Sequence, residues 1–397
     1  MSGELSASGY RLPATGNGSP HPLAPSPAGG RAGERQEAGA GPPLPQAGEG
    51  VARSAGGEGA VRWQPAAGSR QPPRLGFLGV GWIGRHRMQA IADAGVAEVA
   101  ALADTSPEVL DAAAEGLPRA RRARTLDELL EQALDGVVIA TPSALHAEQA
   151  IRALEAGLAV FCQKPLGRTA AETRRVVDAA RAADRLLAVD LSYRFTRGMQ
   201  AIRERVQAGE LGRVYAVDLV FHNAYGPDRA WFYDPSLSGG GCVMDLGVHL
   251  VDLALWTLGF PAVEQVSGRL FAGGAPLRDA SVQVEDYALA RLDLAGGAAV
   301  QLACSWRLSA GQDAVIGARF YGSDGGAALR NLHGSFFDFV AERYRGTARE
   351  TLASPPDEWG GRAAVEWATR LAAGERFDPA AERLVEVAAA LDGIYGR

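Results

Sequence analysis

A glycine-rich turn between an apolar run and a helical stretch limits the possible folds of this chain more than any other feature. Residues 74–80 form a short apolar run, typical of a buried strand, and Gly79-Val-Gly81-Trp-Ile-Gly84 leads from it into a helical stretch ending near Ala94. Such glycines permit a tight turn, the close approach of a pyrophosphate and close helix–strand packing. The helix N-terminus then offers free N–H groups to the phosphates. We therefore predict a dinucleotide-binding turn, rather than a turn without a ligand, made by Gly79, Gly81, Trp82, Ile83 and Gly84.

An acidic residue after the next apolar run indicates which dinucleotide is bound. Residues 99–103 predict a second strand, and Asp104 follows it directly. A carboxylate at this place hydrogen-bonds the adenosine ribose and repels a 2′-phosphate, which favours NAD over NADP. Asp104 also precedes Thr105-Ser106-Pro107, which is typical of a helix start, so a helix-capping role is compatible with the same position. The basic stretch 119–124 is expected to be a solvated face rather than a phosphate site.

Strands and helices continue to alternate as far as residue 193. Two capping boxes, Thr125-Leu-Asp-Glu128 and Thr169-Ala-Ala-Glu172, predict helix starts. Apolar runs at 136–140, 158–161 and 186–189 predict strands, and a helix carrying His146 is expected after Thr141-Pro142. This alternation predicts an α/β fold, with a parallel, doubly wound Rossmann sheet over residues 74–193.

Lys164 is the only lysine among the 40 basic residues of the chain. It stands in Phe161-Cys162-Gln163-Lys164-Pro165, at the end of an apolar run. Ligands bind at that end of parallel strands. Lysine is a compact ammonium that shares protons readily, whereas arginine stays protonated, so a site that requires lysine points to chemistry rather than to surface charge. We therefore predict a functional lysine, although one lysine left by chance would look the same.

The pattern changes after about residue 194. Val300, Leu302, Cys304 and Trp306 alternate with polar or small residues, a period of two that marks a half-buried antiparallel strand. Residues 214–221, 287–294 and 314–321 predict similar strands, and helices are expected again at about 335–344, 358–372 and 378–394. Residues 194–397 thus predict an α+β domain with a mostly antiparallel open sheet and returning C-terminal helices.

A second group of polar residues follows the glycine run 239–241. Asp245 and His249 are four residues apart, so in an α-helix they share one face. A carboxylate beside an imidazole can orient it, and histidine is well suited to general base work near neutral pH. A histidine packed in the core and paired with Asp245 or Asp252 is the structural alternative. These residues are too few for a zinc site, and no metal is expected.

Composition narrows the class of protein and its compartment. The net charge is −6 and no apolar run appears long enough to span a bilayer, which argues against a nucleic-acid or membrane partner. Cys162, Cys242 and Cys304 fit neither a disulfide framework nor a zinc site, so the cytoplasm is expected. Residues 1–73 are rich in Gly, Pro, Ala and Ser, which predicts a disordered tail, either a tether or a dispensable extension.

Taken in order, these motifs resemble the glucose–fructose oxidoreductase / inositol dehydrogenase (Gfo/Idh/MocA) family. The resemblance covers about residues 74–397 and rests on the glycine turn, Thr141-Pro142 with His146, Lys164-Pro165, and Asp245 with His249 after the glycine run. It implies that Lys164, Asp245 and His249 are catalytic. It also implies that the dinucleotide contacts are Gly79, Gly81, Trp82, Ile83, Gly84, Asp104, Thr141, Pro142, His146, Gln163 and Lys164. One departure is Gln163, where the family usually has Glu; losing this carboxylate removes a neighbour that favours a charged lysine.

The sequence and the resemblance together predict an NAD-dependent oxidoreductase that acts on a secondary alcohol of a sugar, polyol or related metabolite. His249 would remove the hydroxyl proton, Lys164 would stabilise the alkoxide, and Asp245 would orient His249 or bind substrate. Further substrate contacts are expected from Tyr193, Arg194, His222, Trp231 and Tyr233. Two alternatives are an NAD-recycling enzyme that cleaves glycosides and a non-catalytic dinucleotide sensor or scaffold. An exposed sheet face favours a homo-oligomer, a dimer or tetramer.

Overall fold

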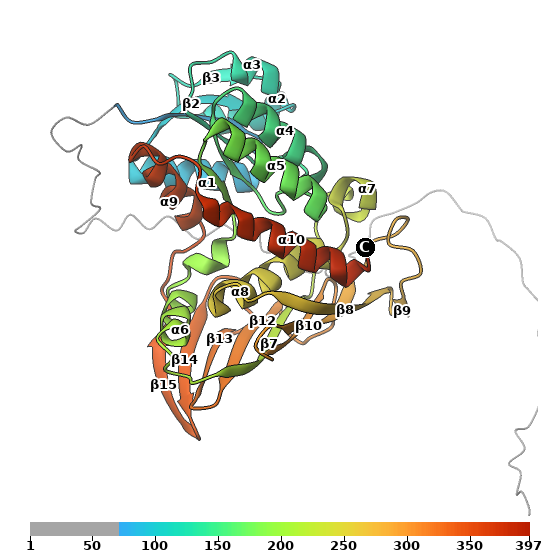
Figure 1. Cartoon of the computed structure of the whole chain (residues 1–397). Coiled ribbons are helices and arrows are strands. Elements are labelled where there is room, and N and C mark those ends of the chain that lie inside the picture. Colours follow the sequence, from blue (N-terminus) through green and yellow to red (C-terminus); the bar gives the residue numbers. More distant parts are fainter. Residues whose placement is uncertain (1–70) are drawn as a thin grey trace, which may run out of the picture. The chain divides into compact units, whose positions relative to one another are not determined.

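The first sheet of the computed structural model, which describes residues 71–397, is the predicted Rossmann sheet (Figure 1). Its six strands are parallel and run in the order β3-β2-β1-β4-β5-β6. They are β1 (Arg74–Leu78), β2 (Glu98–Ala103), β3 (Arg121–Ala123), β4 (Gly136–Ile139), β5 (Ala159–Cys162) and β6 (Leu187–Val189). The helices between them are α1 (Trp82–Ala94), α2 (Pro107–Ala114), α3 (Leu126–Leu130), α4 (Ser143–Glu155) and α5 (Ala170–Ala183).

The capping residues expected from the sequence begin two of these helices. The Thr125 hydroxyl accepts a hydrogen bond from the Glu128 amide at the start of α3, and Thr169 accepts one from Glu172 at the start of α5. Such side chains satisfy amide groups that have no partner within a helix. Because β1, β4 and β5 are buried on both faces, they read as continuous apolar runs in the sequence.

The second sheet has nine strands in the order β15-β14-β13-β12-β7-β11-β10-β8-β9. All neighbouring pairs are antiparallel except β11 with β7. The predicted mostly antiparallel sheet is therefore confirmed. Its strands are β7 (Val214–Asn223), β8 (Val263–Ala272), β9 (Ala275–Pro276), β10 (Tyr287–Leu294), β11 (Ala299–Ser305), β12 (Ala314–Gly322), β13 (Gly326–Asn331), β14 (Phe339–Arg345) and β15 (Ala348–Ala353).

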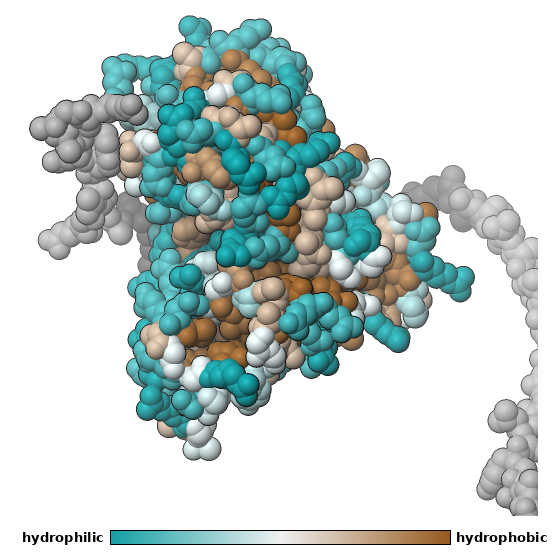
Figure 2. Space-filling view, viewed as in Figure 1, coloured by the Kyte–Doolittle hydropathy of each residue, from teal (hydrophilic) through white to brown (hydrophobic). Residues whose placement is uncertain are grey.

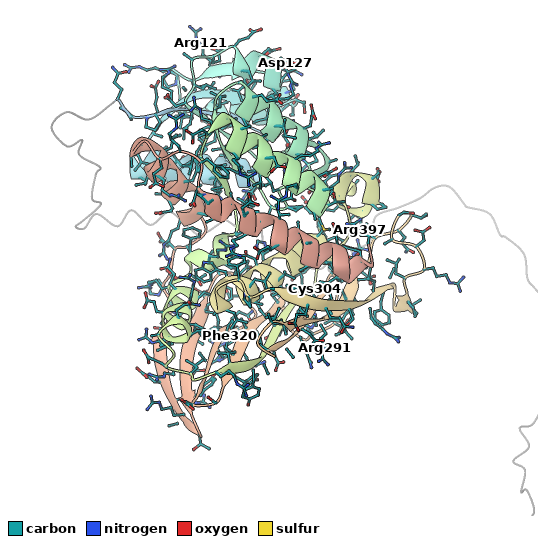
Figure 3. The ribbon with its side chains drawn as sticks, in the orientation of Figure 1. Arg121, Asp127, Arg291, Cys304, Phe320 and Arg397 are labelled. Atoms are coloured by element: carbon teal, nitrogen blue, oxygen red, sulfur yellow. The ribbon has the colours of Figure 1, made fainter. Side chains whose placement is uncertain are left out.

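One face of this sheet is covered and the other is open. Alternate residues of β11 and β12, such as Cys304 and Phe320, join a single apolar core (Figure 3). Helices α6 (Arg197–Gln207), α8 (Val248–Leu258) and α10 (Glu382–Tyr395) pack on this face. Residues that point to the other face, such as Leu289 of β10 and Tyr321 of β12, stay exposed. The period of two read from the sequence thus separates a packed face from an open one.

The prediction of a helix at 335–344 is wrong, because residues 339–345 form strand β14. This strand lies between β13 and β15 and pairs with both of them. Phe339, Val340 and Ala341 are buried there. Alanine, glutamate and arginine in this stretch favour a helix locally, but pairing on both sides supplies more stabilisation than local propensity.

The C-terminal helices connect the two sheets. Helix α9 (Arg362–Ala372) packs on α1, and its Trp367 ring lies 5.7 Å from the Phe161 ring of β5. Helix α10 contacts α5 on one side and β8 and α8 on the other (Figure 1). A short 3-10 turn, η4 (Pro379–Ala381), precedes α10, and the Asp378 side chain caps it by accepting a hydrogen bond from the Ala380 amide.

A helical stretch from Pro235 to Leu258 is long and apolar enough to span a membrane by composition alone, contrary to the expectation from the sequence. It consists of α7 (Pro235–Ser238), the π-helical turn η3 (Val243–Gly247) and α8. However, 83% of its most apolar window is buried inside the structure. Its apolar residues are thus used in the core, beneath the second sheet. The expected disordered tail, residues 1–73, lies outside the described residues except for its last three.

Candidate active site

The glycine turn has the geometry that a pyrophosphate needs. A Cβ atom on Gly84 would lie 2.0 Å from the Gly79 carbonyl oxygen, and one on Gly79 would lie 2.6 Å from that of Ala140. Gly79 also has φ +82°, a region that favours glycine. Nothing lies within 4 Å of the Cβ position of Gly81, so the backbone is open there. The turn therefore packs tightly on the protein side and leaves one side free for a ligand. Trp82 and Ile83 follow as the first residues of α1.

The Asp104 carboxylate ties the second strand to the glycine turn. Its Oδ2 accepts a hydrogen bond from the Val80 amide at 3.0 Å, and its Oδ1 accepts one from Ser106 at 3.0 Å. Ser106, not Asp104, is the N-cap of α2. The capping role considered for Asp104 is therefore wrong. Arg124 donates to the Thr105 carbonyl at 2.8 Å, so one guanidinium of the basic stretch lies beside the Asp104 loop.

Lys164 and Asp245, far apart in sequence, form an ion pair in the structure. Lys164 Nζ donates to Asp245 Oδ1 at 2.6 Å and to the Asp245 backbone carbonyl at 2.7 Å. Their side chains are only 19% and 16% exposed. The other carboxylate oxygen, Oδ2, accepts a hydrogen bond from the Trp306 indole at 3.0 Å. Because an ammonium has three donors, Lys164 keeps one N–H for a substrate oxygen.

Asp245 is carried on a π-helical turn and is bonded to Lys164, not to His249. Asp245 lies within η3, where the chain winds more widely than in an α-helix, and His249 lies in α8. No hydrogen bond joins Asp245 to His249 among residues 71–397. The expectation that Asp245 orients His249 is therefore corrected: Asp245 holds Lys164.

A buried carboxylate holds the glycine run in front of this turn. Glu285 is fully buried and accepts hydrogen bonds from the Gly241 amide at 3.0 Å and the Val243 amide at 2.9 Å. The Tyr395 hydroxyl of α10 donates to the same carboxylate at 2.8 Å. Burial raises the pKa of Glu285, and these donors oppose that effect. Glu285 thus fixes the start of η3, on which Asp245 is carried.

His249 is a neutral imidazole in an enclosed position. It is 7% exposed, and its Nδ1 is buried with no hydrogen-bond partner in the described chain. Its ring lies edge-on to the Tyr193 ring at 4.9 Å. Burial first, and then the positive charges of Lys164 and Arg87, hold the pKa of His249 well below its ordinary value of 6.5. A histidine kept neutral in this way can accept a proton.

His146 joins two loops at the carboxyl ends of the strands. It is 1% exposed, and its Nδ1 and Nε2 lie 2.7 Å from the carbonyl oxygens of Pro165 and Thr141 respectively. Desolvation is the main cause that lowers its pKa. Pro142 is the N-cap residue of α4. His146 therefore holds the Thr141–Pro142 segment against the Lys164–Pro165 segment.

Gln163 belongs to a buried network that sequence reasoning missed. Its Nε2 donates to Asp190 Oδ2 at 2.5 Å, and Arg87 of α1 donates to the same oxygen at 2.6 Å. Gln163, Asp190 and Arg87 are at most 8% exposed. Asp190 follows β6, so it lies at the same edge of the sheet as Lys164. A carboxylate is therefore present beside residue 163 although residue 163 itself is an amide.

This network predicts that Gln163→Glu destabilises the protein at neutral pH. Two carboxylates at hydrogen-bond distance cannot both ionise, so one must keep a proton. Protonating a carboxyl with an ordinary pKa of about 4.3 costs up to about 3.7 kcal/mol at pH 7, and Arg87 offsets part of this. Because the folded-state pKa of the introduced carboxyl is raised, the loss should vanish below about pH 4 and grow as pH rises. Urea unfolding at several pH values measures it.

The double variant Gln163→Glu/Asp190→Asn is the matched control for this prediction. It exchanges the amide and the carboxylate, so that one negative charge remains beside Arg87. It should recover most of the lost free energy of unfolding at pH 7. Equal stability of Gln163→Glu and the native chain at pH 7 would contradict the predicted carboxylate pair.

The five expected substrate contacts lie in different places. Tyr193 packs against His249, and Tyr233 and Trp231 lie in the short helix η2 (Ala230–Tyr233) near Trp306, 5.6 Å from ring to ring for Tyr233. Arg194 instead forms a buried ion pair with Asp252 beneath α8, with its Nε 2.8 Å from Oδ2. His222 is bonded to Ser305 at 2.8 Å, on the open face of the sheet. No described contact links Arg194 or His222 to Lys164.

Four further residues of the site carried no clear signal in the sequence. Trp306 and Asp190 act through contacts across distant segments, and Arg87 and Glu285 are charged residues whose burial no pattern indicates. The one available signal was Trp306 at the end of an alternating strand, where an aromatic residue that can donate reaches the domain boundary.

Comparison with known families decides the identity of this fold. Residues 74–191 match the oxidoreductase family with an NAD-binding Rossmann fold, and residues 199–328 match the GFO/IDH/MocA C-terminal domain. The chain belongs to the GFO/IDH/MocA family. It is therefore a member of an oxidoreductase family, and the resemblance inferred from the sequence motifs is confirmed.

Relatives with known names include dehydrogenases and a catabolic protein. The rhizopine catabolism protein MocA of Rhizobium meliloti is 30% identical over 297 residues, covering 71% of this chain and 90% of that protein. Inositol 2-dehydrogenase of Rhizobium meliloti (strain 1021) is 31% identical, covering 65% and 76%. The match to D-glucoside 3-dehydrogenase of Escherichia coli (strain K12) is 32% identical but spans only 50% of this chain and 60% of the enzyme.

Solved structures share the fold. Levoglucosan dehydrogenase in complex with NADH has a TM-score of 0.71 at 21% identity, covering 82% of this chain and 96% of that chain. A 3-ketoreductase from Actinomadura kijaniata, in complex with TDP-benzene and NADP, has a TM-score of 0.71 at 22% identity, covering 82% and 98%. One of these structures holds NADH and the other NADP, so this fold accommodates either dinucleotide.

Proposed function

We propose that this member of the family is an NAD-dependent dehydrogenase that oxidises, or in reverse forms, a secondary alcohol of a sugar or polyol. The observation that carries the proposal is the Lys164–Asp245 ion pair, which leaves one ammonium N–H free at the carboxyl end of β5. This end of the sheet also holds the glycine turn. The names of the relatives, among them inositol 2-dehydrogenase and D-glucoside 3-dehydrogenase, agree with such a substrate.

Three residues of the chain divide the work at the reacting oxygen. A bound nicotinamide supplies the hydride chemistry. His249, held neutral by burial, takes the hydroxyl proton, and Lys164 donates its free N–H to the alkoxide that develops. Asp245 positions Lys164, and Trp306 and the Glu285-bound glycine run position Asp245. The tight and open sides of the glycine turn fit the pyrophosphate of the dinucleotide.

The choice of dinucleotide is tested by binding alone. Because the Asp104 carboxylate repels a 2′-phosphate, NADH should bind more tightly than NADPH in a fluorescence titration of the purified protein. Asp104→Ser should narrow the difference, since Arg124 beside the same loop can then approach the phosphate. Arg119→Ser, in the same basic stretch, serves as the control and should change neither affinity. Tighter binding of NADPH to the native chain would contradict the assignment.

The measured products separate this proposal from the two alternatives. A dehydrogenase produces NADH in proportion to the sugar oxidised, whereas an enzyme that recycles its bound dinucleotide cleaves a glycoside with no net NADH. A sensor does neither. The ion pair and the neutral histidine favour a dehydrogenase over a sensor, because binding alone requires no general base.

We infer that the open sheet face meets a second copy of this chain. Leu289 and Tyr321, on β10 and β12, are 45% and 36% exposed. Figure 2 shows hydrophobic patches at the surface in its lower half, where Figure 1 places the second sheet together with the helices α6 and α8 that cover its other face. An exposed apolar patch commonly marks an interface.

We place the protein in the cytoplasm, since its three cysteines are all free. Light scattering tests the first inference and fractionation the second.

A further inference from the structure

Arg307 has a backbone conformation that arginine rarely adopts. Its φ is +56°, in the left-handed region, which costs a residue with a side chain about 1–2 kcal/mol. The Arg307 amide donates to the Tyr225 carbonyl at 3.0 Å, and the next amide, of Leu308, donates to Asn223 at 3.0 Å. These bonds hold the residue in place just after Trp306. A strained residue next to a candidate active site suggests a function for its side chain.

The Arg307 side chain is fixed by an aromatic neighbour. Its guanidinium lies 5.0 Å from the centre of the Tyr233 ring, and its Nη2 donates to the Tyr233 hydroxyl at 3.1 Å. That hydroxyl in turn donates to the Pro227 carbonyl at 2.8 Å. A Cβ atom on Gly226 would lie 2.3 Å from the Tyr233 hydroxyl and 3.0 Å from Arg307 Nε. The guanidinium is therefore held in one orientation by close packing.

A chain of contacts links this guanidinium to the catalytic ion pair. The Tyr233 ring lies edge-on to the Trp306 ring at 5.6 Å, and Trp306 is hydrogen-bonded to Asp245. Arg307 is exposed to solvent. Among residues 71–397 no carboxylate lies within 4.0 Å of the Arg307 guanidinium. Most other arginines in this range have such a partner, for example Arg194, Arg291 and Arg362. Arg307 is therefore a fixed arginine without a carboxylate partner in the described residues. It lies beside the rings of Tyr233 and Trp306, and Trp306 contacts the Asp245–Lys164 ion pair.

We propose that Arg307 binds an anionic group on the substrate, so that the preferred substrates are sugars carrying a carboxylate or a phosphate. This proposal rests on the dehydrogenase function inferred above and specifies its substrate class. The fork of an arginine matches both carboxylate and phosphate oxygens. The chain as a whole carries a net charge of −6, so an anionic substrate needs a local cation to offset this repulsion.

Binding to the protein–NADH complex tests the proposal without turnover. Calorimetry compares glucose, galactose and mannose with their uronates and their 6-phosphates, so that carboxylate and phosphate are separate arms. At least one anionic sugar should bind about tenfold or more tightly than its neutral parent, and added salt should weaken that binding. Arg307→Gln should remove the difference, and Arg307→Lys should retain part of it. Arg319→Gln, which alters an exposed arginine on β12 of the same sheet, should change nothing.

The outcomes separate failure of this proposal from failure of the proposed function. Equal binding of neutral and anionic sugars, no binding of any sugar, or an equal loss of both kinds in Arg307→Gln overturns the role of Arg307. The titration of NADH in the same samples is independent of Arg307. If the native chain does not bind NADH, the proposed dehydrogenase function itself is overturned. Thermal unfolding of Arg307→Gln, expected to match the native protein, excludes a folding defect.

Discussion

Replacing Lys164 by arginine is expected to lower kcat by about 10²- to 10³-fold, the effect of losing one donor to a developing oxyanion. The charge is kept, but a planar guanidinium is wider than an ammonium and cannot make the two short bonds to Asp245 while presenting a third N–H in the same direction. The affinity for NADH should change little. Steady-state kinetics with the best sugar substrate, together with the NADH titration, measure both quantities.

The companion variant Asp245→Asn distinguishes positioning from charge. It keeps one acceptor oxygen for Lys164, but an NH₂ donor replaces the oxygen that accepts from the Trp306 indole, so that hydrogen bond is lost. Because the partner of Lys164 is retained, kcat should fall less than in Lys164→Arg, with NADH affinity again preserved. Turnover near the native rate in Lys164→Arg would rule out the proposed part played by this lysine. Loss of NADH affinity in the same variant would instead assign Lys164 to dinucleotide binding.

Replacing His249 by asparagine is expected to lower kcat by about 10²- to 10⁴-fold, the usual contribution of a general base. In the native protein the pKa of His249 is held well below 6.5, so kcat should fall on the acid side only at pH values well below 6.5, where the imidazole takes up a proton. The variant should lose this acid limb. The pH profile of kcat from pH 4 to 9 measures it.

The same histidine also links stability to pH. Because its folded-state pKa is depressed, the stabilisation it contributes is present above pH 6.5 and is lost as pH falls towards the folded value. His333→Asn, which changes an exposed histidine, is the matched control and should leave both kcat and its pH profile unaltered. An acid limb that survives in His249→Asn would assign the base to another group.

Most of the fold was predictable because it depends on local patterns. The glycine turn, the capping threonines and the apolar runs of the Rossmann sheet each reflect the chemistry of a few adjacent residues, and all were confirmed. The helix prediction for residues 339–345 failed because a strand that is paired on both sides obtains its stability from its neighbours, β13 and β15, and not from its own composition. Helix propensity there pointed the wrong way.

The sequence singled out candidate site residues but could not give their partners. Lys164, Asp245 and His249 stood out in the sequence, yet Asp245, carried on the π-helical turn η3, pairs with Lys164 instead of with His249. That turn depends on Glu285, 40 residues later, and on Tyr395 at the end of the chain. Contacts of this separation leave no periodic signal, because each partner looks like an ordinary charged or aromatic residue.

The sequence by itself determined the class of fold, the dinucleotide turn and the single lysine at the carboxyl end of β5, since short-range sterics and hydrogen bonding dictate them. Only the tertiary structure decided which groups meet: Asp190 beside Gln163, Trp306 beside Asp245, and Arg307 without a counter-charge. The reason is physical. Charge pairing and burial act through space between distant segments, and they take their values only when the two sheets pack together.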